Sequence, residues 1–496
     1  MEEKEAKLSA DEEFQLPDLT EAWDVTATPQ ADEHLSTVYL DSGDLRLARW
    51  GVSIRYRYGE GWTVKLPSDG SGSALVRDEL VFDGSPDEPP PRAVDLLTPY
   101  LRHEQLHEQA RLETLRHVLL LRDPQGQLVA TVVDDDVSVL QGHPAERRFR
   151  EIEVEATPET PPGLLDAMVA RLLDAGTQPP ARTPKYLRAI GGPEAAPAEV
   201  TEAELSPSSS FREAAANAIS QGVIRLIRHD PVIRLDSDPE GVHQARVATR
   251  RLRADLRTFR SELDPQWTQA LRDELGWLGQ ELGTARDADV LLARIAGHAE
   301  TVPEASAEGA QEVVAALEER RMAAHARLLE QLRSDHYLVL LDRMIDAAHN
   351  PAVREGEGPR RAAKVLRPLV RKAWRALDRK VNSVGESPSD DELHVIRIMA
   401  KRCRYAAEVA APVLGKKTRK LAARSADLQD VLGELHDAVV AETWLRGWAG
   451  GRSSATGAFA AGELAAREQD AGSRARARWP RAWARLKASA DRAGLG

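Results

Sequence analysis

The hydrophobic pattern of the chain changes once, near residue 200, and that change limits its folds more than any other feature. Up to about residue 190, short segments such as TVYLDS, VSIRYRY and WTVKLP alternate apolar with polar residues between turns rich in Gly and Pro. This alternation is typical of antiparallel strands. From Phe211 onwards, long stretches rich in Ala, Leu, Arg and Glu repeat with the period of a helix. The sequence therefore predicts an α+β protein, with a β domain followed by an all-α domain.

The segment between the two patterns, GGPEAAPAEVTEAELSPSSS, is rich in Pro, Ala, Ser and Glu and has no periodicity. Such a composition is typical of a linker. We therefore predict a β domain over 1–190, a linker over 191–210 and a helical domain over 211–490. One helix, from Pro162 to about Ala175, is expected to interrupt the strands.

The composition excludes several classes of protein. The one cysteine, Cys403, excludes a disulfide framework and fits a reducing compartment. No apolar run approaches the roughly 20 residues of a membrane helix, and the acidic N-terminus is unlike a secretory leader. Residues 1–200 carry about 20 Lys and Arg against about 37 Asp and Glu, whereas the remainder is mildly basic. We expect a cytoplasmic protein whose halves have different tasks.

The predicted strands carry dense charges of both signs. Arg55 and Arg57 share one strand face, and Glu151, Glu153 and Glu155 share another, because residues two apart in a strand project to the same side. If the sheet closes into a barrel, one face of each strand points into the lumen. Carboxylates there would hold Mg²⁺ or Mn²⁺, and Arg and Lys would hold phosphoryl oxygens. The alternative is a polar outer face with cross-strand ion pairs.

Short motifs follow one another along this half in a definite order. They are Glu3-Lys4-Glu5-Ala6-Lys7, Tyr39-Leu40-Asp41, Ile54-Arg55-Tyr56-Arg57, Trp62 to Lys65, Arg77-Asp78-Glu79, Thr114-Leu115-Arg116, Asp135, Glu151-Ile152-Glu153 and Lys185. In this order they resemble the CYTH family, the triphosphate tunnel metalloenzymes. The resemblance implies an eight-stranded antiparallel β tunnel, a closed barrel, that hydrolyses or rearranges triphosphate compounds with a divalent metal.

The resemblance also implies roles for single residues. The implied metal ligands are Glu3, Glu5, Asp135, Glu151 and Glu153. The basic residues implied to bind the phosphate chain are Lys7, Arg55, Arg57, Lys65, Arg77, Arg111, Arg116 and Lys185. The residues on which catalysis would depend are Glu3, Glu5, Lys7, Arg55, Arg57 and Lys65. The metal would polarise a phosphoryl group, while fixed cations neutralise the charge that develops on its oxygens.

Two features depart from the family pattern. Ser42 stands where Thr usually follows the Y-x-D motif. The triplet Asp134-Asp135-Asp136 leaves the register of its strand open by one residue, and a shift of one residue moves every side chain to the other face.

The helical half contains an internal duplication. VHQARVATRRLRADL, from Val242, aligns with LHVIRIMAKRCRYAA, from Leu393, and LGQELGTARDADV, from Leu278, aligns with LQDVLGELHDAVV, from Leu428. The matched pairs include His243 with His394, Arg246 with Arg397, Arg250 with Lys401, Arg253 with Arg404, and Arg286 with His436. One helical unit is therefore present twice, and we predict two repeated four-helix bundles.

Helical geometry places basic residues of each copy on one face. At about 100° per residue, the first stripe falls within an arc of roughly 80°. The two stripes are His243, Arg246, Arg250, Arg253 and Arg257, and His394, Arg397, Lys401 and Arg404. For one helix, a solvated basic face is the common alternative. Because both copies have the stripe, we favour a groove or pore that binds a long polyanion.

This pattern resembles the CHAD domain, a conserved-histidine α-helical domain of two repeated four-helix units that binds inorganic polyphosphate through its basic surface. The resemblance covers Phe211 to about Ala490. It implies that the histidines donate to phosphate, since the surrounding Arg residues would repel a metal ion. Nucleic acid is less favoured, because the stripes lack interleaved aromatic residues for base stacking.

Together the halves predict a metal-dependent hydrolase of inorganic triphosphate or related phosphoanhydrides, with Mg²⁺ or Mn²⁺ as cofactor and a C-terminal module that binds polyphosphate. One alternative is a non-catalytic polyphosphate-binding or granule-targeting scaffold. Another is an adenylate cyclase or thiamine triphosphatase of the same tunnel family. The expected partners are inorganic triphosphate and polyphosphate, with no membrane, and the expected location is the cytoplasm or its polyphosphate granules.

Overall fold

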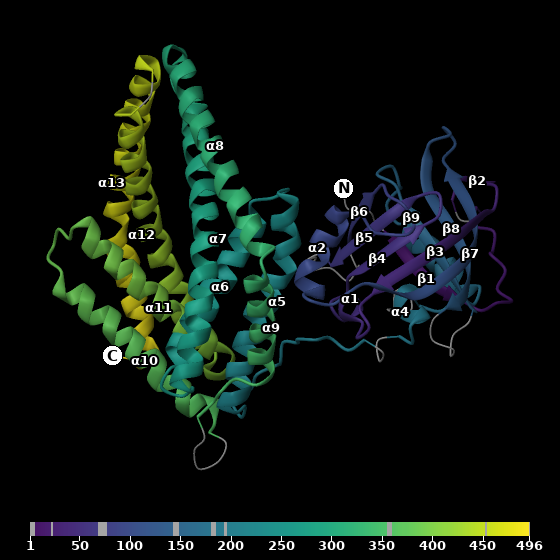
Figure 1. The fold of residues 1–496 in the computed structure, drawn as a ribbon, viewed down its shortest axis with the longest axis horizontal. Coiled ribbons are helices and arrows are strands. Elements are labelled where there is room, and N and C mark those ends of the chain that lie inside the picture. The colour runs from purple at the N-terminus through teal and green to yellow at the C-terminus, as the bar shows by residue number, and fades with distance from the viewer. Residues whose placement is uncertain are drawn as a thin grey trace. The chain divides into compact units, whose positions relative to one another are not determined.

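The structure is a computed structural model that describes residues 5–20, 23–67, 77–141, 148–179, 185–192, 196–354, 360–451 and 454–495. Within these ranges the side chains of Glu5, Arg77 and Asp78 are not described. The chain divides into two compact units, Met1–Glu199 and Val200–Gly496 (Figure 1). The first unit is built on an antiparallel sheet and the second is helical, so the predicted α+β class is confirmed.

The N-terminal unit contains nine strands and four helices in its described residues. The strands are β1 (Glu5–Ala10), β2 (Thr26–Pro29), β3 (Glu33–Asp41), β4 (Ser53–Arg57), β5 (Gly61–Pro67), β6 (Arg77–Phe82), β7 (His107–Arg122), β8 (Leu128–Gln141) and β9 (Arg148–Ala156). The helices are α1 (Arg46–Arg49), α2 (Pro91–Leu101), α3 (Leu164–Asp174) and α4 (Lys185–Ala189). The strands pair in the order β1-β9-β8-β7-β3-β4-β5-β6, and β2 pairs with the far end of β7.

The prediction of a closed eight-stranded barrel is wrong for this sheet. Within the described residues no backbone ladder joins β1 to β6, so these two strands remain the open edges. The ninth strand is present because β7 is long enough to pair first with β3 and then with β2. The two edge strands nevertheless lie close enough for the charge of Lys7 on β1 to act on Glu79 of β6. Burial raises the pKa of Glu79, but Lys65, Arg55 and Lys7 together lower that pKa below its usual value.

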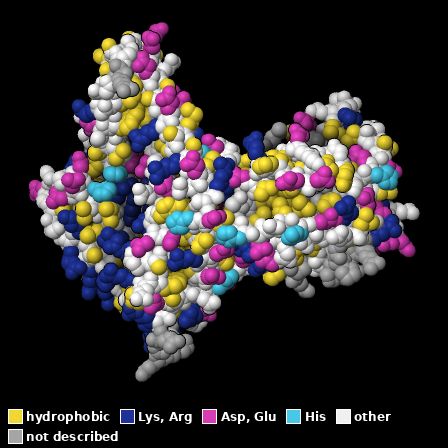
Figure 2. All heavy atoms as spheres, in the orientation of Figure 1, with side chains coloured by type: hydrophobic (Ala, Val, Ile, Leu, Met, Phe, Trp, Pro, Cys, Tyr) yellow, Lys and Arg dark blue, Asp and Glu magenta, His cyan; other side chains and the backbone are white. Residues whose placement is uncertain are grey.

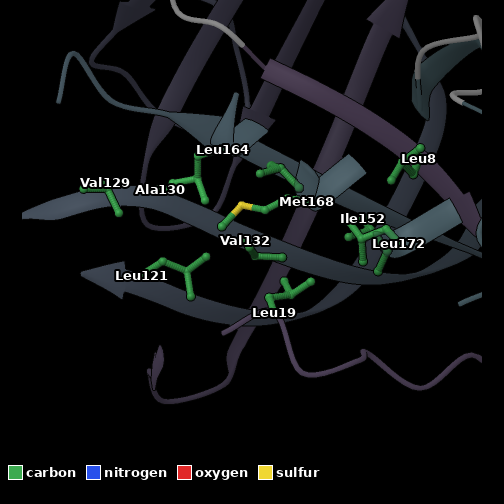
Figure 3. Close-up of a cluster of buried hydrophobic side chains, with 11 residues drawn as sticks. Leu8, Leu19, Leu121, Val129, Ala130, Val132, Ile152, Leu164, Met168 and Leu172 are labelled. Carbon is green, nitrogen blue, oxygen red and sulfur yellow. The ribbon is translucent and has the colours of Figure 1, made fainter. Parts of the chain in front are cut away.

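The two faces of this sheet have different characters. One face is apolar over β1, β7, β8 and β9, where Leu8, Leu121, Val132 and Ile152 pack with Met168 of α3 (Figure 3). Because opposite residues in a ladder project to one side, the register Lys7↔Glu153 and Asp135↔Glu151 puts these charged side chains on the other face. We call that other face, which α3 does not cover, the inner face.

Two residues at the boundary between the units each contact their own unit. Glu199 accepts hydrogen bonds from the Trp50 indole and the Arg102 guanidinium at 2.6 Å each. The backbone N–H of Ala203 donates to Asn217 at 2.7 Å. Glu199 is therefore held to the first unit and Ala203 to the second.

The helical unit contains nine α-helices in its described residues. They are α5 (Phe211–Leu235), α6 (Glu240–Phe259), α7 (Pro265–Ala299), α8 (Ala307–Leu332), α9 (Asp335–His349), α10 (Ala362–Ser383), α11 (Asp390–Leu414), α12 (Lys416–Ala449) and α13 (Ala455–Arg492). Ser210 and Glu213 form a capping box at the start of α5, and Ser389 and Glu392 form one at the start of α11.

The duplication is visible in the helix order. Helices α5 to α8 correspond to α10 to α13, and consecutive helices pack against one another within each set (Figure 1). The sets meet through α6 with α11, α5 with α10 and α8 with α13. The predicted two four-helix bundles did not include α9, which follows the first set and packs against α5. Within the described part of the chain, none of the helices has an apolar stretch long enough to cross a lipid bilayer.

Candidate functional site

Three buried carboxylates converge on one ammonium group at the inner face of the sheet. Lys185, at the start of α4, hydrogen-bonds Asp135, and its Nζ lies 3.5 Å from Glu151 and 3.3 Å from Glu153. Other cations surround this acidic cluster: Arg116 donates twice to Asp135 at 2.8 Å, and Lys7 donates to Glu153 at 2.9 Å. The carboxylates are therefore held by positive charge supplied from three different elements, α4, β7 and β1.

The two glutamates of this acidic cluster have different acidities. Burial raises the pKa of Glu153, but the charges of Lys185 and Lys7 outweigh burial and hold that pKa at about 2. Burial also raises the pKa of Glu151, and there it prevails, with the negative charge of Glu153 adding to the increase. Arg188, one helical turn after Lys185, donates to Glu151 at 3.2 Å. Sequence reasoning missed Arg188, although its spacing from Lys185 on a helix was a usable signal.

The Y-x-D motif positions α4 over the inner face. Asp41 accepts hydrogen bonds from the backbone N–H groups of Leu47 and Ala48, at 2.8 and 2.9 Å, and from the Tyr186 hydroxyl at 2.8 Å. The Tyr39 ring stacks on the Tyr186 ring with a centroid distance of 5.0 Å. These contacts fix the residue next to Lys185, so the motif acts on the acidic cluster through α4.

A basic cluster lies on the same face of the sheet, on β4 and β5. The register Tyr39↔Arg55 continues the inner face from β3 to β4, and Ser53↔Lys65 continues it to β5. Lys65 pairs with Glu79, while the Nε of Arg55 is buried and has no hydrogen-bond partner in the described residues. Burial and the neighbouring Arg55 charge lower the pKa of Lys65. An unpartnered buried guanidinium N–H is costly, and an oxyanion would satisfy it.

The structure places the remaining predicted residues of this half as follows. Arg57 follows Arg55 on the inner face but is held by Glu60 at 3.0 Å and Thr37 at 3.3 Å. Arg111 lies opposite Val38, which puts it on the other face, where it pairs with Glu108 at 2.8 Å. Glu3 and the side chains of Glu5 and Arg77 are outside the described residues.

The register of the aspartate triplet is now defined. Asp135 pairs with Glu151 and faces the acidic cluster. Asp134 and Asp136 face the opposite side, where they bind Arg150 and Arg148 respectively. A shift of one residue would have exchanged these two sets.

The acidic cluster suits a hard cation in its donor chemistry, because it offers only carboxylate oxygens. In this structure the cation at its centre is the Lys185 ammonium. Within the residues described, no three or more Asp, Glu, His or Cys side chains are arranged to hold a metal ion. A divalent ion at this cluster would therefore have to share it with Lys185 or replace it.

The basic stripes of α6 and α11 meet in the helical unit, where the two helices pack together. Burial lowers the pKa of Lys401 to about 7, and the charges of Arg397 on α11 and of Arg250 and Arg246 on α6 contribute. The pKa of Arg397 is also lowered by burial and by the same two α6 arginines. We call Arg246, Arg250, Arg397 and Lys401 the cationic cluster. Figure 2 shows Lys and Arg side chains gathered on the visible face of this unit.

Most of this cationic cluster lacks an acidic partner. In the described residues no carboxylate lies within ion-pair distance of Arg250, Arg397 or Lys401, and the Nε groups of both arginines are buried without a hydrogen-bond partner. Arg246 is different, since it donates to Asp287 at 2.5 Å and to the Gly283 carbonyl at 3.2 Å. Mutual repulsion of half-buried cations without counter-charges favours a bound anion.

The duplication extends to the surfaces on which these arginines lie. A Cβ at Gly283 would lie 3.9 Å from the Arg246 guanidinium, and a Cβ at Gly433 would lie 3.7 Å from the Arg397 Nε. Gly283 and Gly433 occupy equivalent positions in the two aligned L-G pairs. A Cβ at either position would only make ordinary van der Waals contact with the arginine, so in each repeat an arginine lies at the same place beside the next helix.

The other stripe residues have different neighbours. His243 lies near Arg286, and the ring of His394 lies 4.6 Å from that of His436. Arg257 lies near Arg402, and Arg253 lies against Gly276 and Gly279 of α7. Arg404 instead donates to Glu408 at 2.7 Å. The sequence contained that signal, because Glu408 follows Arg404 by four residues on the same helix.

Comparison with known proteins identifies most of the helical unit. Residues 217–446 match the family model described as CHAD domain. This segment is a CHAD domain. It begins within α5 and ends within α12, so it includes both helices that carry the cationic cluster.

The chain also has relatives of similar length. Two uncharacterized proteins of Mycobacterium tuberculosis, from strains CDC 1551 and H37Rv, are each 29% identical over 437 residues, covering 83% of this chain and 82% of the relative. Among solved structures, PptA from Streptomyces chartreusis is 23% identical with a TM-score of 0.46, covering 55% of this chain and 99% of that one. The CHAD domain from the plant Ricinus communis is 27% identical with a TM-score of 0.45, covering 60% and 95%.

One buried carboxyl of the CHAD domain makes its stability depend on pH. Both side-chain oxygens of Asp255 on α6 are buried without a hydrogen-bond partner in the described residues. Burial raises the pKa of Asp255 to about 7, with Arg251 partly opposing the shift and Glu408 adding to it. In the unfolded chain this carboxyl ionises near pH 4. The contribution of Asp255 to the free energy of unfolding is therefore most favourable below about pH 4, and it is lost as pH rises through about 7.

Asp255→Asn is expected to stabilise the CHAD domain at pH 8 by roughly 2–4 kcal/mol, because the amide removes the buried charge. Thermal unfolding followed by helical circular dichroism at several pH values measures this effect. The difference from wild type should grow between pH 4 and 7 and then stay constant. Asp273→Asn, at an exposed position of α7, serves as the control. A difference that does not vary with pH would contradict the assignment.

Proposed function

We propose that this chain binds inorganic polyphosphate through its CHAD domain and hydrolyses phosphoanhydride bonds of inorganic triphosphate at the inner face of its N-terminal sheet. The observation that carries the proposal is the cationic cluster, in which Arg250, Arg397 and Lys401 meet without an acidic partner in the described residues. CHAD domains are associated with polyphosphate, whose regularly spaced negative charges would neutralise these cations. A chain of phosphates can also follow a stripe along two helices.

The inner face supports the hydrolytic part of the proposal. The basic cluster of Arg55 and Lys65 would bind phosphoryl oxygens and neutralise the charge that grows on them during cleavage. Strand β3, which carries Tyr39, lies between β4 and β7 in the sheet. Burial raises the pKa of Tyr39, but the positive charges of Arg55 and Lys65 outweigh burial and lower that pKa. The antiparallel sheet and the order of its motifs fit the resemblance to the CYTH family.

The proposed cofactor is Mg²⁺ or Mn²⁺, for which Asp135, Glu151 and Glu153 of the acidic cluster would have to rearrange around the ion in place of Lys185. When bound, the ion would supply positive charge that polarises a phosphoryl group. The chain's own cations have separate tasks. Lys185 and Arg116 help to lower the pKa values of Asp135 and Glu153. The charge of Lys7 acts on Glu153 and also on Glu79 of the edge strand β6. Lys185 would exchange its carboxylate contacts for phosphate oxygens when substrate enters.

One observation favours a second candidate function. The central position of the acidic cluster is already filled by Lys185, and Arg116 binds Asp135 through two hydrogen bonds. An N-terminal unit locked in this arrangement would bind phosphate chains without cleaving them. The second candidate is therefore a non-catalytic polyphosphate-binding scaffold.

A single assay on the full chain separates these candidates. Phosphate release is measured from inorganic triphosphate, ATP, thiamine triphosphate and long-chain polyphosphate, with Mg²⁺, Mn²⁺ or a chelator. We expect release from inorganic triphosphate that requires the divalent ion. Preferential turnover of ATP or thiamine triphosphate would replace the substrate assignment. No turnover of any substrate, together with polyphosphate binding, would favour the scaffold.

A further inference from the structure

The two repeats differ in the kind of cation that they place at and beside the cationic cluster. The duplication aligns Arg250 of the first repeat with Lys401 of the second, and Arg286 with His436. Guanidinium groups remain charged at any physiological pH, whereas ammonium and imidazole groups can lose their charge. The first repeat therefore contributes permanent charge at two positions where the second repeat contributes groups that can titrate.

The groups that titrate lie together on α11 and α12. The rings of His394 and His436 are 4.6 Å apart at an interplanar angle of 38°. The Nδ1 of His394 is buried and has no hydrogen-bond partner in the described residues. Lys401 lies two helical turns from His394 on the same face of α11, with Arg397 between them. A buried unpartnered imidazole nitrogen and an ammonium without a counter-ion thus share one surface.

The charges that act on this surface come from three helices. Arg246 and Arg250 reach it from α6, Arg397 and Asp391 belong to α11, and Asp437 belongs to α12. Asp437 is the aligned partner of Asp287, but in the described residues it forms no ion pair with Arg397, whereas Asp287 binds Arg246. The positive neighbours therefore dominate the second half.

We propose that the CHAD domain holds a phosphate chain in two unequal half-sites, and that the half-site of α11 and α12 takes up protons at Lys401 and the His394–His436 pair when the chain binds. This inference rests on the proposed polyphosphate binding. It adds a proton-coupled half-site, so that the affinity for a phosphate chain rises as pH falls.

Electrostatics explains the direction of the coupling. Burial and the surrounding cations lower the pKa values of Lys401, His394 and His436, and that of Lys401 falls to about 7. A bound anion reverses the electrostatic part of this effect and favours the protonated forms. Any group whose pKa rises on binding takes up a proton and makes binding weaker at higher pH. The internal phosphates of a long chain keep one negative charge throughout this range and do not contribute.

The test measures binding of long-chain polyphosphate to the full chain between pH 6 and pH 8.5. For wild type we expect the affinity to fall by up to about tenfold per pH unit for each proton taken up. Titration calorimetry in two buffers with different ionisation enthalpies should give a proton uptake of at least one near pH 7.5. The double variant Lys401→Arg/His436→Arg copies the first repeat, and we expect it to retain at pH 8.5 the binding that wild type loses.

Lys417→Arg, at an exposed position of α12, is the matched control and should keep the wild-type dependence on pH. If the affinities of wild type and the double variant depended on pH in the same way, or if wild type took up no proton, the proton-coupled half-site would be rejected. Polyphosphate binding itself would remain supported. Absence of binding at pH 6 would overturn both. If helical circular dichroism shows that the double variant does not fold, the proton uptake of wild type decides alone.

Discussion

Replacing Arg250 and Arg397 together by Ala should weaken binding of long-chain polyphosphate by at least about 100-fold at 0.1 M salt. Each guanidinium has a buried Nε without a partner in the described residues, so each can form new charge-assisted hydrogen bonds with a phosphate. Such bonds contribute about 1.5–3 kcal/mol each. The slope of log affinity against log salt concentration should also become less steep by about two. Titration calorimetry across a range of salt concentrations measures both quantities.

The matched control for this prediction removes the same charge from elsewhere in the CHAD domain. Arg320→Ala/Lys417→Ala changes two exposed positions, on α8 and α12. It should alter the affinity by less than about threefold, because exposed charges away from a site act only through screened long-range attraction. Equal losses in the two double variants would mean that polyphosphate responds to overall charge and not to the meeting of α6 with α11.

The second large effect concerns the inner face of the N-terminal sheet. Arg55→Ala/Lys65→Ala is expected to lower the rate of phosphate release from inorganic triphosphate by about 10³-fold or more, since each removed cation would stabilise developing negative charge. Polyphosphate binding by the CHAD domain should persist, which shows that the helical unit is folded. Circular dichroism in the strand region should match that of wild type, which shows that the sheet is intact. Phosphate release under saturating substrate measures the effect.

Arg148→Ala is the matched control, because Arg148 lies on the opposite face of the sheet, half exposed and paired with Asp136. It should retain the wild-type rate within a factor of about two, as expected for loss of a surface ion pair. If Arg55→Ala/Lys65→Ala also retained the rate, the inner face would not be the catalytic surface.

The local sequence pattern predicts most strands of the N-terminal unit, but it does not predict which face of the sheet each side chain occupies. Alternation located most of the strands, because a half-buried strand needs an apolar and a polar side. It could not decide which of Asp134, Asp135 and Asp136 faces inward, since that depends on pairing with Glu151 of β9. The same limit applies to Arg111, whose register against Val38 puts it on the other face. Closure of the sheet depends on contacts between distant edge strands, which no local pattern records.

In the helical unit, periodicity and duplication were stronger guides. Helical spacing placed the basic residues of each repeat on one face of a helix. The structure adds that α6 and α11 pack together, so that the positive charges of the two stripes repel one another. That contact is tertiary and could not be derived from one helix at a time. Helix α9 was not predicted, because it lies outside the repeated unit. The pairing of Arg404 with Glu408 was readable from their spacing.

A crystal structure of the full chain with a bound phosphate chain is the most direct test of the account. We expect phosphate groups within hydrogen-bond distance of Arg250 and Arg397 and next to Lys401, along the contact between α6 and α11. Phosphate density confined to other surfaces, with both guanidinium Nε groups still without partners, would contradict the assignment of the cationic cluster as the polyphosphate site.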